Sequence, residues 1–348
     1  MSHRNNTLVW DSTAEVVKLL DTPTKKIAFL IHINPDGDAI GSALGLSKLL
    51  KNKGHDCLVI SPNDFPDFLK WMPGATEICL LSESFNGAEE FMKNAELIFV
   101  VDCNELKRII RLQEDYNAST AYKILIDHHP GPDLDVNCIF SDTSVSSTAE
   151  LIYRFMTETG LQQYADQDVA TCLLTGIMTD TGCFSHNSST RRTFETVASL
   201  LDYGIDKDEI YNRIYNNYSE KRMHLLGFSL HEKMEVLDEY HTAIISLTFD
   251  ELNSFNFQVG DTEGFVNYPL SIKGICFSVL FVENGNKIRV SLRSKGSFAV
   301  NEIARKYFNG GGHANASGGD SYESMNETIS RFKAIIPDYQ EELSDYED

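Results

Sequence analysis

The sequence has no long apolar segment. Its longest apolar runs are too short to span a bilayer, and the opening residues, MSHRNNTLVW, contain no apolar signal core. These absences argue against a transmembrane segment and against a secretory leader. We therefore expect a cytoplasmic protein with no membrane partner.

Paired cysteines are also missing. The seven cysteines are odd in number and form no CxxC pair, which argues against a disulfide framework and against a structural zinc site. Each lies in or beside an apolar run, so we expect buried free thiols.

Basic charge is scarce, with 30 Lys and Arg against 51 Asp and Glu, which gives a formal net charge of −21. This balance disfavours duplex DNA as a partner, because affinity for phosphates needs clustered Lys and Arg. A small anionic substrate remains open, since two divalent cations would reverse the local field. The length of 348 residues, with 42% hydrophobic and 23% charged residues, fits a globular chain of two domains.

The most informative stretch is 27–50, IAFLIHINPDGDAIGSALGLSKLL, which predicts a buried strand, an acidic loop and a helix that Gly54 ends. Its loop carries His32, Asp36 and Asp38. In a parallel sheet such a loop lies at the carboxyl end of its strand, where ligands bind. Carboxylates with some imidazole suit Mn²⁺ or Mg²⁺, although a helix-capping turn would use the same residue types.

Two more apolar strands end in ionisable residues. The run ELIFVVD ends in Asp102, and YKILIDHH leads into Asp127, His128 and His129. Acids that converge at one edge of a sheet repel each other unless metals or protons neutralise them. The repetition therefore favours a metal centre, and Asp180, which ends an apolar helix before a glycine turn, is a further candidate ligand.

The remaining pattern predicts helices and strands on both sides of a boundary near residues 205–240. A strand over 55–61 would place His55 at the surface, and VENGNKIRVSLR predicts a hairpin. Helices are expected over residues 1–24, 147–160, 166–178, 193–203, 218–237, 301–308 and 322–336.

In this order and spacing the sequence resembles the DHH phosphoesterase superfamily. It is similar to the DHH-DHHA1 branch, which includes the bifunctional oligoribonucleases and 3′-phosphoadenosine 5′-phosphate phosphatases of the NrnA type. The resemblance is carried by His32-Ile-Asn-Pro-Asp36-Gly-Asp38-Ala-Ile-Gly-Ser42, Asp102, Asp127-His128-His129, Asp180 and Gly310-Gly311-Gly312-His313-Ala-Asn315-Ala-Ser317-Gly-Gly319.

The resemblance implies a centre of two Mn²⁺ ions, with Mg²⁺ or Co²⁺ also compatible. One ion would be held by His32 and Asp36. The second would be held by Asp38, His128 and Asp180, while Asp102 would bridge the two ions. Asp127 would orient an imidazole, His129 would point at the substrate phosphate, and the two metals would activate a bridging water for attack on phosphorus.

The resemblance also implies an α/β fold with two domains. A DHH catalytic domain with a mainly parallel sheet flanked by helices would span 1–205, followed by a helical linker over 206–240. A smaller α/β DHHA1 domain over 241–340 would bind substrate, and 341–348 would be an acidic tail. Substrate contacts would come from Arg293, Ser294, Gly311, Gly312, His313, Asn315 and Ser317. The glycines there would form an anion-binding nest of backbone N–H groups, unless they only end the preceding helix.

The expected activity is Mn²⁺-dependent hydrolysis of short oligoribonucleotides to mononucleotides, and of 3′-phosphoadenosine 5′-phosphate to AMP. The partner would be a short single-stranded RNA or a nucleotide, and a homodimer is compatible with the sequence. A pyrophosphatase or exopolyphosphatase is the main alternative, because relatives with these metal motifs cleave phosphoanhydrides. A single-strand DNA exonuclease fits less well, and a non-catalytic RNA- or nucleotide-binding module is the alternative outside enzymes.

Overall fold

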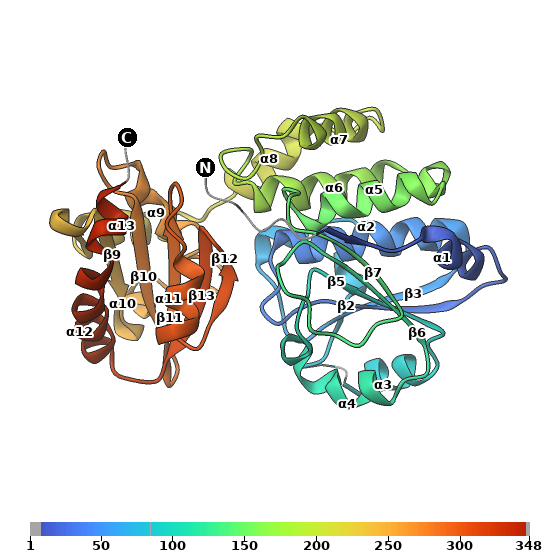
Figure 1. The fold of residues 1–348 in the computed structure, drawn as a ribbon, viewed down its shortest axis with the longest axis horizontal. Coiled ribbons are helices and arrows are strands. Elements are labelled where there is room, and N and C mark those ends of the chain that lie inside the picture. Colours follow the sequence, from blue (N-terminus) through green and yellow to red (C-terminus); the bar gives the residue numbers. More distant parts are fainter. Residues whose placement is uncertain (1–7, 84, 346–348) are drawn as a thin grey trace. The chain divides into compact units, whose positions relative to one another are not determined.

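The chain forms two compact units, whose boundary lies between Asn217 and Tyr218 (Figure 1). The structure is a computed structural model that describes residues 8–83 and 85–345. Both units are of the α/β type, as the sequence predicts. Within the described ranges, no helix combines the length and the apolar character needed to cross a membrane.

The first unit is built on a seven-stranded sheet with the order β1-β7-β6-β5-β2-β3-β4 among its described residues. All neighbouring strands are parallel except β1, which pairs antiparallel with β7 at one edge. The strands are β1 Leu8–Trp10, β2 Lys26–Leu30, β3 Asp56–Ser61, β4 Cys79–Leu80, β5 Leu97–Val101, β6 Tyr122–Asp127 and β7 Cys138–Asp142. The mainly parallel sheet is therefore confirmed, whereas β4, β7 and β1, which lies within the helix predicted over 1–24, were not expected.

Helices cover both faces of this sheet (Figure 1). Two of them, α3 Phe85–Lys93 and α4 Gln113–Ala118, pack on one face. The opposite face carries α1 Thr13–Leu20, α2 Gly37–Lys53, α5 Thr148–Glu158, α6 Gln167–Asp180, α7 Arg191–Leu201 and α8 Lys207–Tyr215.

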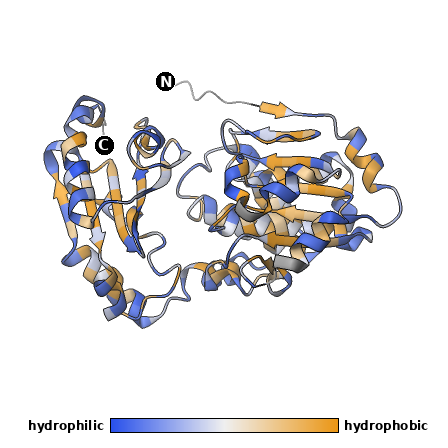
Figure 2. Ribbon diagram, turned by 90° about the horizontal axis from the view of Figure 1, so that it is seen from below, coloured by the Kyte–Doolittle hydropathy of each residue, from blue (hydrophilic) through white to orange (hydrophobic). Residues whose placement is uncertain are grey.

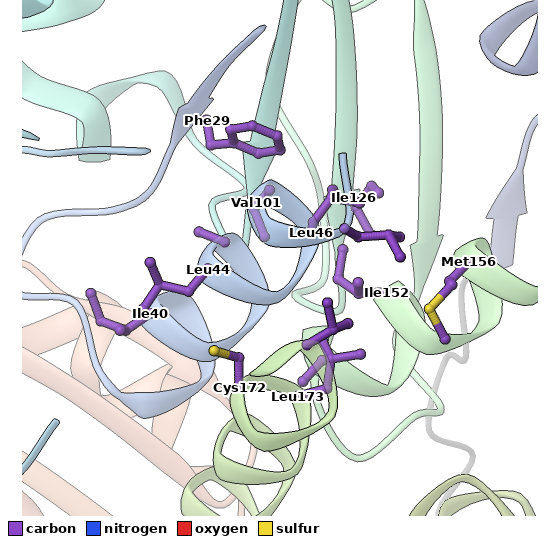
Figure 3. Packing of buried hydrophobic residues seen from close by; sticks show 14 of the residues in the cluster. Phe29, Ile40, Leu44, Leu46, Val101, Ile126, Ile152, Met156, Cys172 and Leu173 are labelled. Atoms are coloured by element: carbon purple, nitrogen blue, oxygen red, sulfur yellow. The ribbon is translucent and has the colours of Figure 1, made fainter. Parts of the chain in front are cut away.

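Burial on both faces explains why the strands are continuous apolar runs rather than alternating ones. In β2, Ile27 and Phe29 enter the core beneath α2, whereas Ala28 and Leu30 enter the core beneath α3. Figure 3 shows Phe29 above side chains of α2, α5 and α6. Hydrophobic residues accordingly run along the strands of both sheets in Figure 2.

Helices α2 and α6 approach each other closely because glycine stands at their contact. A Cβ on Gly41 would lie 2.5 Å from the backbone oxygen of Cys172. One turn further along α2, the nearest atoms to a Cβ on Gly45 would belong to side chains, with Leu173 at 2.7 Å and Cys172 at 3.5 Å. The close approach therefore depends most on Gly41, where the opposing atoms are backbone and cannot rotate away.

The second unit has a six-stranded sheet with the order β12-β13-β11-β10-β9-β8 among its described residues. Its strands are β8 Met234–Leu237, β9 Thr242–Leu247, β10 Phe277–Asn284, β11 Lys287–Ser294, β12 Gly311–His313 and β13 Ala316–Ser321. The predicted hairpin is confirmed as β10 and β11. The helices are α9 Glu220–His231, α10 Phe249–Ser254, α11 Val300–Tyr307, α12 Met325–Ile335 and α13 Gln340–Ser344.

One helix expected in this unit is shorter than predicted. The helix predicted over 218–237 ends at His231, and β8 follows it as an edge strand that pairs with β9. Met234 and Val236 are half-buried and Glu235 between them is exposed, which is the alternation typical of a strand. The helical pattern of the preceding residues made this short alternation hard to recognise in the sequence. The expected acidic tail begins as α13, whose Leu343 is buried; residues 346–348 of that tail and residues 1–7 of the leading helix lie outside the described residues.

His55 is buried, which corrects the expectation of a surface residue. Its Nδ1 accepts the Lys25 N–H at 3.1 Å, so its proton lies on Nε2, which donates to Leu20 O at 3.1 Å. Burial lowers the pKa of His55 below its ordinary value of 6.5. The neutral ring thus joins α1 to the start of β2.

We expect His55→Phe to cost about 1–3 kcal/mol of unfolding free energy at pH 8, because it leaves a buried N–H and a buried C=O without their partner. Because the pKa is lowered on folding, the histidine's contribution is complete above pH 6.5 and is lost as the pH falls below it. Urea denaturation should therefore show a difference between wild type and variant that shrinks from pH 8 to pH 5. A constant difference would contradict the neutral bridging role.

Gly41→Ala should destabilise the protein by about 1–3 kcal/mol, because the new methyl group must push two helix backbones apart. Gly45→Ala is the matched control, since both changes gain the same helix propensity of about 1 kcal/mol. Thermal unfolding of both variants tests this. If Gly41→Ala were as stable as Gly45→Ala, backbone contact between α2 and α6 would not limit their approach.

Candidate metal centre

The candidate ligands gather at the carboxyl ends of three neighbouring parallel strands, β2, β5 and β6. His32 follows β2, Asp102 follows β5, and His128 and His129 follow β6. Parallel strands deliver their carboxyl ends to one edge, so ligands distant in sequence become neighbours. The convergence expected from the apolar runs is therefore confirmed.

Asp36 and Asp38 enter from the first turn of α2. Asp36 is the N-cap, and its Oδ1 accepts the N–H groups of Asp38 and Ala39, both at 3.1 Å. The capping turn and the ligand hypothesis are thus compatible, because capping occupies one carboxylate oxygen of Asp36 and the second can face a metal.

Asp38 is held by the amino end of α5. Its Oδ2 accepts the Thr148 N–H at 2.7 Å, and its Oδ1 accepts the Ala149 N–H at 2.9 Å and the Ser42 hydroxyl at 3.1 Å. The positive end of a helix dipole favours a carboxylate there. These contacts fix the orientation of a side chain that is 1% exposed.

Asp102 has an unusual backbone conformation, with φ of 55°. Asp tolerates this left-handed region better than most residues. The Asp102 N–H donates to Ile126 O at 3.1 Å, and Oδ1 accepts the Thr148 hydroxyl at 2.8 Å. Thr148 therefore contacts two of the candidate ligands, one through its backbone and one through its side chain.

The imidazoles of His32 and His128 face carboxylates across a common space. His32 Nδ1 donates to Ile33 O at 2.8 Å, which leaves Nε2, 3.5 Å from Asp102 Oδ2. His128 Nε2 lies 3.8 Å from Asp38, 3.7 Å from Asp102 and 3.7 Å from Asp180. Such separations exceed hydrogen bonds, so these groups surround a shared volume rather than bond to one another.

Asp127 orients the imidazole of His129. Its Oδ1 accepts His129 Nδ1–H at 2.8 Å, and its Oδ2 accepts the His129 backbone N–H at 3.1 Å. The carboxylate thereby sets the tautomer of His129 with the proton on Nδ1.

Burial and mutual repulsion disfavour the charged forms of two acids in the cluster, Asp38 and Asp102. Burial, followed by the charges of Asp102 and Asp36, raises the pKa of Asp38 well above its usual value. Burial, followed by Asp36 and then Asp127, does the same to Asp102. Burial lowers the pKa of His32 to about 4, so this imidazole stays neutral. Acids that repel each other beside a neutral imidazole are the donor set that a divalent cation resolves.

Two ligand sets share Asp102. Ligand atoms of His32, Asp36 and Asp102 lie within 4.8 Å of one another, as do those of Asp38, Asp102 and His128. The donors are oxygen and nitrogen, because the neighbouring thiol of Cys103 turns to Glu105 O at 3.5 Å. These donors suit Mn²⁺ or Mg²⁺ better than a metal that prefers thiolate ligands. All six candidate metal ligands are brought together, while their ligation stays a prediction.

The predicted substrate residues lie together in the second unit, on and beside β11, β12 and β13. Three of them make internal hydrogen bonds: the Ser294 hydroxyl to Phe298 O at 2.6 Å, Asn315 Nδ2 to Ser294 Oγ at 2.9 Å, and the Ser317 hydroxyl to His313 O at 2.7 Å. Arg293 Nη1 donates to Leu292 O at 3.0 Å.

The glycines of this block have a packing role that the sequence pattern did not reveal. A Cβ on Gly310 would lie 2.0 Å from Gly318 O, and one on Gly319 would lie 2.3 Å from Phe308 O. The block forms strands β12 and β13 against the end of α11, so these two positions require glycine whether or not a ligand binds.

Two contributors to the centre were missed from the sequence, Thr148 and Arg108, and Ser42 stood in the predicted motif without an assigned role. Ser42 and Thr148 hydrogen-bond the carboxylates of Asp38 and Asp102. Arg108 lies beside His32, because its backbone oxygen accepts the Ile33 N–H at 2.9 Å. The segment SSTAE signals only a helix start, and no local pattern indicates what that helix contacts.

Comparisons with known proteins agree with this geometry. The family model of the DHH family N-terminal domain matches residues 26–177, and that of the DHHA1 domain matches residues 241–340. The chain is 30% identical to the bifunctional oligoribonuclease and PAP phosphatase NrnA of Bacillus subtilis, over 84% of this chain and 88% of the relative. It is 31% identical to the probable NrnA of Streptococcus mutans, over 86% and 90%.

A solved structure is similar over almost the whole length. The crystal structure of an exopolyphosphatase-related protein from Bacteroides fragilis is 41% identical, with a TM-score of 0.92, and the match covers 99% of this chain and 100% of that one. The two matched domains, the relatives and the cluster of acids and imidazoles all point to the same family. The chain therefore belongs to the DHH family of metal-dependent phosphoesterases, in the branch that carries a C-terminal DHHA1 domain.

Proposed function

We propose that this enzyme hydrolyses short oligoribonucleotides to mononucleotides, and 3′-phosphoadenosine 5′-phosphate to AMP, with Mn²⁺ as its metal. The observation that carries the proposal is the cluster of all six candidate ligands around Asp102, in a chain that also has a DHHA1 domain. Relatives at about 30% identity are named for these two activities.

In this proposal His32 and Asp36 would hold one ion, Asp38, His128 and Asp180 would hold the second, and Asp102 would serve both. Bound divalent cations supply Lewis-acid stabilisation and activate water. The protein keeps the ligands in place: the amino end of α5 fixes Asp38, and the Thr148 hydroxyl fixes Asp102. A ligand whose orientation is already fixed by its neighbours loses less conformational entropy when the metal binds.

His129 contacts the substrate phosphate in this scheme. Because Nδ1 is hydrogen-bonded to Asp127, the substrate contact falls to Nε2 on the opposite side of the ring. Asp127 is thus a positioning residue, and its two hydrogen bonds to His129 hold both the ring and the backbone of that residue.

Nucleotide recognition belongs to the second unit. We propose that Arg293 and His313 contact the substrate, together with the backbone of Gly311 and Gly312. A guanidinium can bind a phosphate through two parallel hydrogen bonds. Ser294, Asn315 and Ser317 support this surface, because their side chains are tied to neighbouring backbone oxygens or to one another.

A phosphoanhydride hydrolase is the second candidate. It is favoured by the Bacteroides fragilis relative, which is described as exopolyphosphatase-related and is 41% identical. The same metal centre would serve pyrophosphate or polyphosphate, since both reactions attack phosphorus. A cytoplasmic location and a homodimer remain predictions from the sequence.

A hydrolysis panel with the purified protein and Mn²⁺ tests the proposal. It compares 5′-phosphorylated di- to pentaribonucleotides, 3′-phosphoadenosine 5′-phosphate, pyrophosphate, polyphosphate and a long single strand. We expect the shortest RNA to be cleaved fastest, with cleavage of the bisphosphate as well. Preference for pyrophosphate or polyphosphate would replace the substrate assignment, and no turnover despite bound metal would favour the binding module.

Asp102→Asn should lower turnover more than about 100-fold, because even residues that only support a ligand cost 10–100-fold. Asparagine is the informative replacement, since it tolerates the φ of 55° that alanine would strain. Calorimetric titration with Mn²⁺ should show weaker binding, and Mn²⁺ should raise the melting temperature less than in wild type.

The matched control is Asp202→Asn, an exposed carboxylate of the same unit that lies at the end of α7. It should bind Mn²⁺ and turn over substrate as wild type does. Wild-type activity and Mn²⁺ affinity in Asp102→Asn would contradict the role of Asp102 as the shared ligand.

A further inference from the structure

Arg108 is fixed beside the metal centre by its backbone. It lies in the 3-10 helix Leu106–Leu112, a few residues beyond the candidate ligand Asp102. Its carbonyl oxygen accepts the N–H of Ile33 at 2.9 Å, and its own N–H donates to Glu105 O at 3.0 Å. The first of these hydrogen bonds places Arg108 against Ile33, the residue that follows His32.

The segment that carries Arg108 is joined to the loop after His129. Asn104 Nδ2 donates to Pro130 O at 3.0 Å, and Asn104 O accepts the Asp133 N–H at 2.7 Å. Glu105 and Asp133 also form a parallel bridge. The loop that follows Asp102 and the loop that follows His129 are therefore joined by hydrogen bonds, and Arg108 lies in the first of them.

Arg108 is half-buried, and among the described residues it forms no ion pair with a carboxylate. Its Nη1 makes a long contact of 3.5 Å to Asn104 Oδ1. Burial is the main cause of the lowered pKa of His32 and of the raised pKa of Asp102; the charge of Arg108 adds to the first shift and opposes the second.

An arginine in this position has two possible uses. It could offset the negative charge of the cluster, or its donors could bind an anion that arrives with the substrate. A cation that only compensated charge would gain most by pairing directly with an acid such as Asp36, which is exposed to solvent at the same edge. Arginine presents five N–H donors in a planar fork that matches phosphate oxygens.

We propose that Arg108 binds the scissile phosphate from the side of His32 and Asp36 and stabilises the charge that develops on its oxygens. The inference rests on the proposed phosphoester hydrolysis. In that reaction water supplies an oxygen to phosphorus, the bond from phosphorus to the leaving oxygen breaks, and a proton from the water ends on that leaving oxygen. Arg108 neither gains nor loses a proton; it donates hydrogen bonds.

The test compares Arg108→Gln and Arg108→Lys with Lys107→Gln. Lys107 is the matched control, because it is the neighbouring cation but points outward, with 77% of its side chain exposed and Glu105 as its partner. On a 5′-phosphorylated diadenylate at saturating Mn²⁺, Arg108→Gln should lower kcat/KM by about 100-fold or more, as for loss of a donor to a developing oxyanion. Lysine should restore part of the loss, since it keeps the charge but not the fork.

Two binding measurements separate phosphate recognition from charge compensation. Mn²⁺ affinity should be unchanged or tighter in Arg108→Gln, because a cation has been removed near a cation site. AMP should bind the Mn²⁺-loaded Arg108→Gln protein at least about tenfold more weakly than wild type, with Lys107→Gln unchanged. Loss of activity that follows loss of Mn²⁺ binding, or unchanged kcat/KM and AMP affinity, would overturn the proposal.

The outcomes also distinguish this inference from the proposed function. If wild type cleaves no oligonucleotide but AMP binding still depends on Arg108, the substrate assignment fails and phosphate binding by Arg108 stands. If wild type cleaves the diadenylate and Arg108→Gln does so equally well with the wild-type melting temperature, the function stands and the role of Arg108 fails.

Discussion

The capture of Asp38 by the amino end of α5 is the interaction on which the centre depends. The backbone N–H groups of Thr148 and Ala149 each donate a hydrogen bond to one oxygen of this buried carboxylate. That carboxylate begins α2, which in turn packs closely on α6, the helix that ends in Asp180. Three helices and three strands therefore have to be in place together, and small shifts among them would move ligands out of reach of a common ion.

The sequence predicts the part of this arrangement that is local. Apolar runs that end in Asp102 or in Asp127 mark buried strands and place acids at one edge, so the cluster could be expected before its geometry was known. Three other features could not be predicted from the sequence: the edge strand β8, the burial of His55 and the support of Asp38 by Thr148. Each depends on a partner in another element or loop, and no local pattern specifies that partner.

Function and packing make overlapping demands in the second unit. Glycine at 310 and 319 is required because neighbouring backbone lies where a Cβ would stand, and the same glycines look like a ligand-binding motif in sequence. Resemblance to a family cannot separate the two causes, because both keep glycine in place. The contacts of Ser294 and Asn315 make the same point, since polar side chains that suggest substrate contact are engaged with the protein itself.

The spread of the ligands along the chain also sets the order of events during synthesis. His32 and Asp180 stand at opposite ends of the cluster in sequence, and α6 must dock before Asp180 reaches His128. Chains are made from the amino terminus and domains generally fold as units, so the nascent protein cannot assemble all six candidate ligands until residue 180 has left the ribosome. Assembly of the candidate centre is then a late step in the folding of the first unit, and truncated chains that end before residue 180 carry only part of it.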